Sequence, residues 1–325
     1  MISKLQFYIS NYTNPYRNLA TEKFLFDNVA DDCLILYLWQ NQNTVVVGKN
    51  QNALTECKCS LLEKEGGFLA RRLSGGGSVF HDLGNLNFTF LCKTENYDLT
   101  KQMQVIKEAC ALGGIFAEIS GRNDILTDGR KFSGNAFYNS KGKSYHHGTI
   151  LINADKEKLQ RYLTPPKAKL QTKGVKSVKS RVINLSEINP ALTVEDMKEY
   201  MLSAFEKVYA LPIEEFKISD TEEIITLAKK YSAWEYLYAP SLPFTFSCDG
   251  NFPWGNIEIQ LDVKSGIIQS AQIFTDAMDH TLSDMLKEVF SGCIFRIEEM
   301  EKSILSKISA PVSTDILKLL KDQEL

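Results

Sequence analysis

Hydrophobic residues follow both helical and extended patterns in the N-terminal part of the chain. Apolar side chains recur at helical spacing over 18–28 and over 99–111, and two glycines follow the second stretch and end it. Four short apolar, β-branched or aromatic runs predict strands: 34–40, 44–47, 86–92 and 145–153. A polar segment at 41–43 separates the first two strands, so we expect them to form a hairpin. Because strands occur in hairpins as well as beside helices, the pattern predicts an α+β fold with a large mixed sheet.

The C-terminal part begins with a change of pattern. Ser219 and Glu222 have the spacing of a capping box, which predicts the start of a helix. Residues 241–255 then contain two prolines and two glycines without strong periodicity, as is typical of a domain boundary. We therefore predict a large domain over 1–245 and a small domain over 246–325.

The small domain has the clearest alternation in the chain. Apolar and polar residues alternate over 257–263, and a second strand, 267–274, returns after a short turn. Helical patterns follow near 282–290 and 314–322. A hairpin followed by helices predicts a small α+β C-terminal domain.

Composition and charge narrow the class of protein. The 325 residues carry 37 basic and 40 acidic side chains, a net charge of −3, which argues against a dedicated nucleic-acid-binding protein. The apolar runs are far shorter than the roughly 20 residues of a membrane-spanning helix, and the N-terminus has no signal-peptide core. Seven cysteines with scattered spacing are typical of a reducing cytosol, and Cys57 and Cys59 lack the second ligand pair of a zinc site. We expect a cytoplasmic monomer that binds neither nucleic acid nor membranes.

A glycine-rich loop at 75–77 is the first segment with candidate chemistry. Three glycines let the backbone approach a ligand closely, and their successive N–H groups can converge on an anion. Arg71 and Arg72 precede the loop and supply permanent positive charge. A flexible surface turn is the simpler explanation of the glycines alone. Their position between two arginines and a strand-like segment favours phosphate or adenylate binding, although no Gly-Lys-Ser/Thr ends the loop as in a Walker motif.

A lysine is the second candidate. Asp128-Gly129 predicts a hairpin turn, and Lys131 follows on the outgoing strand among small residues that include Gly134. Its ammonium group is suited to a phosphate or a polarised carbonyl. An edge lysine that blocks aggregation explains the same pattern equally well.

Two further segments carry unusual residues. His146 and His147 are adjacent on a strand, so they point to opposite faces and are not expected to share a metal. From 158 to 186 the chain has no acidic residue but many basic ones. This basic stretch fits a solvated loop, or a mobile loop that closes over a phosphorylated ligand.

The motifs RRLSGGGSVFHDLGNLNFTF (71–90), GRNDI (121–125), GRKFSGNA (129–136) and HHGTIL (146–151) together resemble the lipoate–protein ligase family. The run at 252–276 is similar to the accessory domain of that family. The resemblance covers nearly the whole chain and implies the fold of biotin and lipoate ligases. It also implies a reaction in two steps, in which ATP and lipoate form lipoyl-adenylate and a lysine of an acceptor protein then takes the lipoyl group.

The resemblance implies roles for particular residues. By position, the implied ATP- and adenylate-binding residues are Arg71, Gly75, Gly76, Gly77, Ser78, Val79, Asn123, Asp124 and Lys131. The implied lipoate-binding residues are Arg71, Ser74, Gly76, His81, Lys131, Gly134 and His147. Lys131 matches the lysine that contacts both the lipoyl carboxyl and the α-phosphate, and Asp124 falls in the region that binds Mg²⁺. The implied mobile loop contains Lys173, Lys176, Lys179 and Arg181.

Three alternatives concern the reaction and its acceptors. Related octanoyl and lipoyl transferases form a thioester on a cysteine, but no cysteine occurs here between Cys110 and Cys248. Biotin ligases share the overall fold, but their glycine loop has a different alternation of arginine and glycine. A non-catalytic lipoyl-adenylate-binding module is the third class, and the presence of Lys131 argues against it. The expected acceptors are apo lipoyl domains of 2-oxoacid dehydrogenase E2 subunits, the glycine-cleavage H protein, or both.

Overall fold

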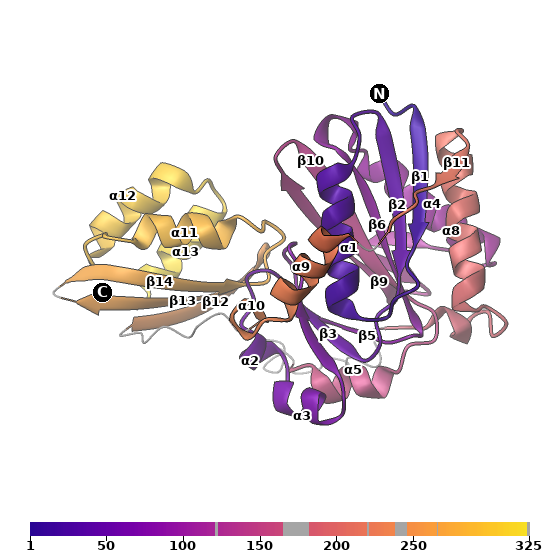
Figure 1. The fold of residues 1–325 in the computed structure, drawn as a ribbon. Coiled ribbons are helices and arrows are strands. Elements are labelled where there is room, and N and C mark those ends of the chain that lie inside the picture. The colour runs from indigo at the N-terminus through magenta and orange to yellow at the C-terminus, as the bar shows by residue number, and fades with distance from the viewer. Residues whose placement is uncertain (121–122, 165–181, 220, 238–245, 265, 324–325) are drawn as a thin grey trace. The chain divides into compact units, whose positions relative to one another are not determined.

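The computed structural model describes residues 1–120, 123–164, 182–219, 221–237, 246–264 and 266–323 (Figure 1). It divides into two compact units. The larger unit comprises Met1–Val46, Cys57–Arg71 and Val79–Leu237, and the smaller comprises Val47–Glu56, Arg72–Ser78 and Tyr238–Leu325. The expected boundary between 245 and 246 touches a stretch outside the described residues, so its position stays a prediction.

An eight-stranded mixed sheet forms the centre of the larger unit, in the order β11-β1-β2-β6-β10-β9-β8-β7. Its strands are β1 (Lys4–Ile9), β2 (Cys33–Trp39), β6 (Asn85–Lys93), β7 (Glu118–Ser120), β8 (Asp124–Thr127), β9 (Arg130–Ser140), β10 (Lys143–Leu151) and β11 (Ile213–Glu215). β1 pairs in parallel with β2 and β11, and the other neighbours are antiparallel. The expectation of an α+β fold with a large mixed sheet is confirmed.

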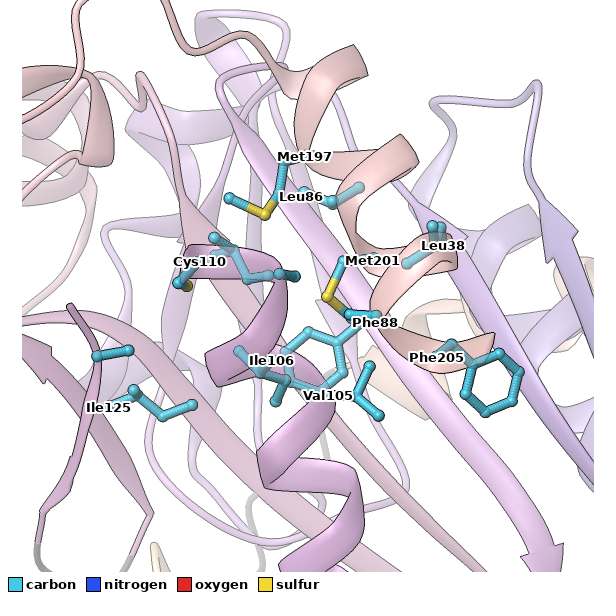
Figure 2. Packing of buried hydrophobic residues seen from close by; sticks show 14 of the residues in the cluster. Leu38, Leu86, Phe88, Val105, Ile106, Cys110, Ile125, Met197, Met201 and Phe205 are labelled. Carbon is cyan, nitrogen blue, oxygen red and sulfur yellow. The ribbon is translucent and has the colours of Figure 1, made fainter. Parts of the chain in front are cut away.

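Helices cover both faces of this sheet (Figure 1). The helices α4 (Leu99–Leu112) and α8 (Val194–Tyr209) pack on one face, and α1 (Pro15–Asn28) and α9 (Glu222–Ser232) pack on the other. Strand β2 is buried along its whole length because its side chains alternate between the two hydrophobic clusters. Figure 2 shows Met201 of α8 near Phe88 of β6, and Met197 and Phe205 of α8 belong to the same buried cluster.

Side-chain caps fix where three of these helices begin. The side chain of Asn14 accepts a hydrogen bond from the backbone of Arg17 and Pro15 opens α1, while Asp98 caps α4 in the same way. Thr193 and Asp196 form a capping box at the start of α8. These caps satisfy N–H groups that have no partner within the helix.

The predicted hairpin of 34–40 and 44–47 is wrong. Strand β3 (Thr44–Val47) lies in a separate sheet, between β4 (Phe68–Arg71) and β5 (Val79–His81), while β2 pairs with β1 and β6. The intervening Asn41 is fully buried and accepts a hydrogen bond from Asn18 at 2.9 Å, so the polar segment redirects the chain rather than turning at the surface.

The predicted capping box at Ser219 and Glu222 is also wrong. Helix α9 begins at Glu222, and the residue that caps it is Thr221, whose hydroxyl accepts a hydrogen bond from the backbone of Ile224.

The smaller unit contains the predicted C-terminal hairpin. Its antiparallel sheet consists of β12 (Phe246–Phe252), β13 (Gly255–Lys264) and β14 (Ile267–Thr275). Alternate residues of β13 are buried against the helices α11 (Leu282–Phe290), α12 (Ile297–Lys307) and α13 (Val312–Lys321). The predicted helices correspond to α11 and α13, whereas α12 was not expected.

Short elements complete the two units. They are α2 (Ala53–Glu56), α3 (Cys59–Lys64), α5 (Lys156–Tyr162), α10 (Trp234–Leu237), η1 (Thr94–Asn96) and η2 (Leu185–Glu187). None of the helices in the described part of the chain has the length and apolar content to cross a bilayer. All seven cysteines are free thiols, and only Cys293 is partly exposed.

Candidate functional site

A tight hairpin positions Lys131. Asp128 and Gly129 both have positive φ, 50° and 68°, as a two-residue turn of type I′ requires. The turn connects β8 to β9, and Lys131 is the second residue of β9. The predicted turn and the predicted place of the lysine on the outgoing strand are confirmed.

The ammonium group of Lys131 pairs with a carboxylate on the neighbouring strand. Its Nζ lies 2.7 Å from Oδ1 of Asp124, and the two side chains are 34% and 38% exposed. A Cβ atom at Gly134 would lie 3.0 Å from the same Nζ, so the glycine leaves room for the lysine to lie across its strand. The structure thus brings three predicted site residues together as a half-exposed cation held in place by an anion.

The alternative that Lys131 blocks an exposed edge does not hold. Strand β9 lies between β8 and β10 within the sheet. The carbonyl of Lys131 also accepts a hydrogen bond from Ile183 at 2.9 Å, and Val182 forms a bridge with Lys131. The chain therefore returns to Lys131 directly after the basic stretch. The predicted loop residues Lys173, Lys176, Lys179 and Arg181 lie outside the described residues.

Asn123 exchanges hydrogen bonds with a residue that was not predicted. Its carbonyl accepts from the backbone and the side-chain amide of Asn135, at 2.9 Å and 3.0 Å. Its own amide donates to the carbonyl of Asn135 at 2.8 Å. These three bonds fix the backbone that carries Asp124. The repeated asparagine in GRNDI and FSGNA was visible in the sequence, but their pairing was not.

The two adjacent histidines lie on opposite faces of the sheet, as predicted. His146 faces α4 and contacts Gln102, whereas His147 faces α1 and places its Nδ1 2.8 Å from Oε1 of Glu22. They therefore do not share a metal ion.

His147 belongs to a buried polar network that the sequence analysis missed. Oε1 of Glu22 also accepts a hydrogen bond from the hydroxyl of Thr89 at 2.7 Å, and Trp39 donates to that hydroxyl at 3.1 Å. All four side chains are at least nine-tenths buried. One signal was present, because Glu22 occupies a helical position in phase with the apolar Leu19 and would be expected to face the core.

His81 contacts this network through the ring of Trp39. Its Nδ1 is 3.2 Å from the side-chain amide of Asn41, and its ring packs edge-on against Trp39. Val79, two residues earlier in β5, pairs with Val46 of β3. The strand β5 thus carries two predicted residues, one polar and buried and one apolar.

The glycine loop belongs to the smaller unit, and the side chain of Arg72 binds its backbone carbonyls. The guanidinium of Arg72 donates to the hydroxyl of Ser74 and to the carbonyls of Gly75 and Gly77, at 2.7–3.2 Å. The sequence analysis expected positive charge from Arg72, but the family resemblance assigned a binding role to Arg71 alone and did not predict that Arg72 binds the loop backbone.

The structure requires a glycine at positions 75 and 76 of the loop for two different reasons, but not at position 77. A Cβ at Gly75 would lie 2.3 Å from the carbonyl oxygen of Ala277, and Gly76 has a φ of +87°. A Cβ at Gly77 would meet nothing within 4 Å. The protein itself gives no packing reason for a glycine at position 77, because the space beside it is open.

Ser78 closes the loop. Its hydroxyl donates to Oε1 of Gln51 at 2.8 Å, and the same oxygen accepts from the backbone of Gly48 at 2.9 Å. The short segment that contains Gly48 and Gln51 therefore supports the glycine loop within the smaller unit.

Arg71 is buried in the larger unit and binds main-chain carbonyls. Its Nε donates to Tyr236 at 3.1 Å and its Nη2 donates to Leu237 at 2.6 Å. Burial lowers the pKa of Arg71 from its usual value. In this structure Arg71 fastens the C-terminal end of α10.

Asp124 is the residue at which the family resemblance implies a magnesium ion. Within the described ranges, no three His, Cys, Asp or Glu side chains gather as metal ligands. Mg²⁺ is commonly held by one or two carboxylates together with substrate phosphates. Asp124 is a half-exposed carboxylate of that kind.

Comparison with known proteins identifies the family. The lipoyl protein ligase A/B catalytic domain family matches residues 14–206, and the bacterial lipoate protein ligase C-terminus matches residues 241–318. The chain is 41% identical to lipoate-protein ligase A of Psychrobacter cryohalolentis over 295 residues, which cover 88% of this chain and 87% of the relative.

Two solved structures have the same fold. P. falciparum LipL1, solved in complex with lipoate, has a TM-score of 0.86 and 30% identity, over 97% of this chain and 98% of that one. A bipartite lipoate protein ligase of Thermoplasma acidophilum, studied with its E2 lipoyl domain, has a TM-score of 0.64 and 24% identity, over 76% and 100% of the two chains. On the extent of these matches, the chain belongs to the lipoate–protein ligase family.

Proposed function

We propose that this chain activates lipoate with ATP and transfers the lipoyl group to a lysine of an acceptor protein, with Lys131 at the reacting atoms. The ion pair of Lys131 with Asp124 carries this assignment, because it holds a half-exposed ammonium on a strand beside Gly134. Membership of the lipoate–protein ligase family supports the reaction class.

In the first step, a carboxylate oxygen of lipoate attacks the α-phosphorus of ATP. A new P–O bond forms, the bond to the β-phosphate oxygen breaks, and pyrophosphate leaves with the electron pair. Negative charge grows on the phosphoryl oxygens, and the ammonium of Lys131 stabilises it.

In the second step, the neutral amine of the acceptor lysine attacks the carbonyl carbon of lipoyl-adenylate. A C–N bond forms, the C–O bond to the phosphate breaks, AMP leaves with the electron pair, and the attacking nitrogen gives up one proton to water. The mixed anhydride is already activated, so no protein nucleophile is needed. The absence of any cysteine between Cys110 and Cys248 agrees with a route without an acyl-enzyme.

We propose Mg–ATP as the form of the nucleotide that binds. Asp124 would contribute a carboxylate oxygen to the ion, which would neutralise phosphate charge. The remaining predicted contacts to nucleotide and lipoate, from Ser74, His81 and His147 among others, are part of the same proposal.

The acceptors we propose are lipoyl domains of E2 subunits and the H protein. The T. acidophilum ligase, which shares the fold, was studied with its E2 lipoyl domain. For this chain the acceptor is an expectation from the family.

The test is the intact mass of an apo lipoyl domain after incubation with the protein, ATP, magnesium and lipoate. We expect an ATP-dependent increase by one lipoyl group. Lys131→Ala should lower the rate by about 100- to 1,000-fold, as when a charge-stabilising donor is removed from an active site. Lys198→Ala is the matched control, because Lys198 is also paired with a carboxylate, Glu195, but lies on α8.

Two results would contradict the proposal. No adduct on either an E2 lipoyl domain or an H protein, from folded protein, would point to a transferase with another donor or to a binding module. A normal rate for Lys131→Ala would remove Lys131 from the reacting atoms even if the protein is a ligase.

A further inference from the structure

His146 is a fully buried polar residue outside the predicted site. Its ring lies 5.2–5.9 Å, between centroids, from the rings of Phe88, Phe90 and Phe137. A residue that served only to fill this space could be apolar, like its neighbours. Instead, both ring nitrogens lie within hydrogen-bond distance of an amide side chain, Nδ1 near that of Gln102 and Nε2 near that of Asn135.

The hydrogen bonds determine which nitrogen carries the proton. The side-chain amide of Asn135 donates to Asn123, so Oδ1 of Asn135 is left to accept from Nε2 of His146 at 2.8 Å. Burial, with a smaller contribution from His147, lowers the pKa of His146 to about 3, so the ring is neutral at pH 7. Nε2 therefore bears the hydrogen, and Nδ1 is an acceptor.

Gln102 completes this assignment when its amide is turned. The oxygen of Gln102 is placed 3.2 Å from Nδ1, which would bring two acceptors together, while its buried amide nitrogen has no partner among the described residues. Exchanging the nitrogen and oxygen of this amide gives Nδ1 a donor and the nitrogen an acceptor, and the two atoms of an amide occupy interchangeable positions. The hydrogen bonds then all run in one direction. The amide of Gln102 donates to Nδ1 of His146, and Nε2 of His146 donates to Oδ1 of Asn135.

The bonds continue to the reacting end of the sheet. Asn135 makes three hydrogen bonds with Asn123, and Asn123 precedes Asp124, whose carboxylate lies 2.7 Å from Nζ of Lys131. Gly148 leaves room for this arrangement, because a Cβ there would lie 2.7 Å from Oδ1 of Asn135. Asp124 is partly exposed, and these bonds help to fix the backbone that carries it.

We propose that His146 is a positioning residue, which orients Asn135 so that Asn123 and Asp124 hold the ammonium of Lys131 in place. The inference rests on the proposed role of Lys131. His146 touches none of the reacting groups and acts through two asparagines and a carboxylate. A displacement of reacting groups by about 1 Å can lower a rate by 100-fold.

The experiment measures pyrophosphate release from ATP and lipoate, with kcat and KM determined separately. His146→Phe replaces the ring by one that fits among the three phenylalanines but donates no hydrogen bond. We expect kcat to fall by about tenfold or more, and His146→Gln, which can donate to Asn135, to recover most of it. Phe90→Leu is the matched control, since it perturbs the same core without touching the hydrogen bonds, and its kcat should stay within about twofold of the wild type.

A double-mutant cycle separates positioning from general destabilisation. If His146 acts through Asp124, then His146→Phe should have little further effect on kcat in an Asp124→Ala background. Full multiplication of the two effects, or equal losses in His146→Phe and Phe90→Leu, would overturn the inference. If Lys131→Ala and Asp124→Ala both retain wild-type kcat, the proposed function of this site is wrong as well, which distinguishes the two failures.

A measurement on the wild-type protein covers the case in which His146→Phe does not fold. The imidazole ¹⁵N chemical shifts of His146 should report the neutral tautomer protonated at Nε2 throughout pH 5–8. A tautomer protonated at Nδ1, or a ring that takes up a proton in this range, would break the series of bonds and overturn the inference.

Discussion

His146 and His147 are neighbours in the sequence, yet they lie in different environments on the two faces of strand β10. His146 meets phenyl rings and two amides, whereas His147 meets the carboxylate of Glu22, which Thr89 also contacts. On the α4 face the polar groups are neutral and serve to orient one another. On the α1 face the buried side chain of Glu22 joins His147 and Thr89 in one set of hydrogen bonds. The side chains across the sheet, rather than the histidines, set this difference.

The largest expected effect on stability is on the α1 face of β10, where Glu22 lies. Glu22→Ala leaves His147 and Thr89 without their shared acceptor in a buried place, which should lower the free energy of unfolding by about 3–5 kcal/mol. Gln102→Ala, on the other face, removes a neutral hydrogen bond to His146 and should cost about 1–3 kcal/mol. Urea denaturation of both variants measures the difference. Equal losses would mean that the two faces do not differ in the way we infer.

An intermediate effect concerns acid stability. The pKa of His146 is about 3 in the folded protein, below its usual 6.5, because burial disfavours the charged ring. The unfolded chain binds a proton below about pH 6.5 that the folded chain does not bind until about pH 3, so stability falls as the pH falls through this window. From His146 alone, the loss between pH 7 and pH 5 should be about 2 kcal/mol.

Denaturation at both pH values, for the wild type and His146→Phe, isolates this contribution. The variant has no ring to protonate and should lose less stability on acidification. A variant as acid-sensitive as the wild type would show that other groups dominate.

The smallest expected effect is at Thr89. Thr89→Val keeps the shape of the side chain but removes the donor to Glu22 and the acceptor for Trp39. We expect a loss of about 1–2 kcal/mol in the free energy of unfolding, measured by thermal or urea denaturation. Thr127→Val, a buried threonine on β8 away from Glu22, is a suitable comparison. A loss no greater than that of Thr127→Val would remove Thr89 from the network.

Local chemistry was readable from the sequence wherever a few neighbouring residues decide the structure. The Asp128-Gly129 turn, the strand of Lys131, the opposite faces of the two histidines and the C-terminal hairpin all depend on residues close in the chain. The family was also recognisable, because its motifs span most of the chain.

Pairing between residues that are distant in the chain could not be predicted from the sequence. The pattern of β3 is equally compatible with pairing to β2 or to β5, and the structure pairs it with β5 while Asn41, between β2 and β3, is buried against Asn18. The pairing of Asn123 with Asn135 depends in the same way on the register of β8 and β9. The role of Glu22 needs a partner that lies 125 residues later in the chain.

The distribution of free thiols makes this protein its own reporter of unfolding. Six of the seven cysteines are buried, with Cys33, Cys57, Cys59, Cys92 and Cys110 in the larger unit and Cys248 in the smaller one. An alkylating reagent should therefore modify the partly exposed Cys293 quickly and the others only when their surroundings open. Peptide mass mapping of the modified thiols would then show which unit opens first, without any engineered label.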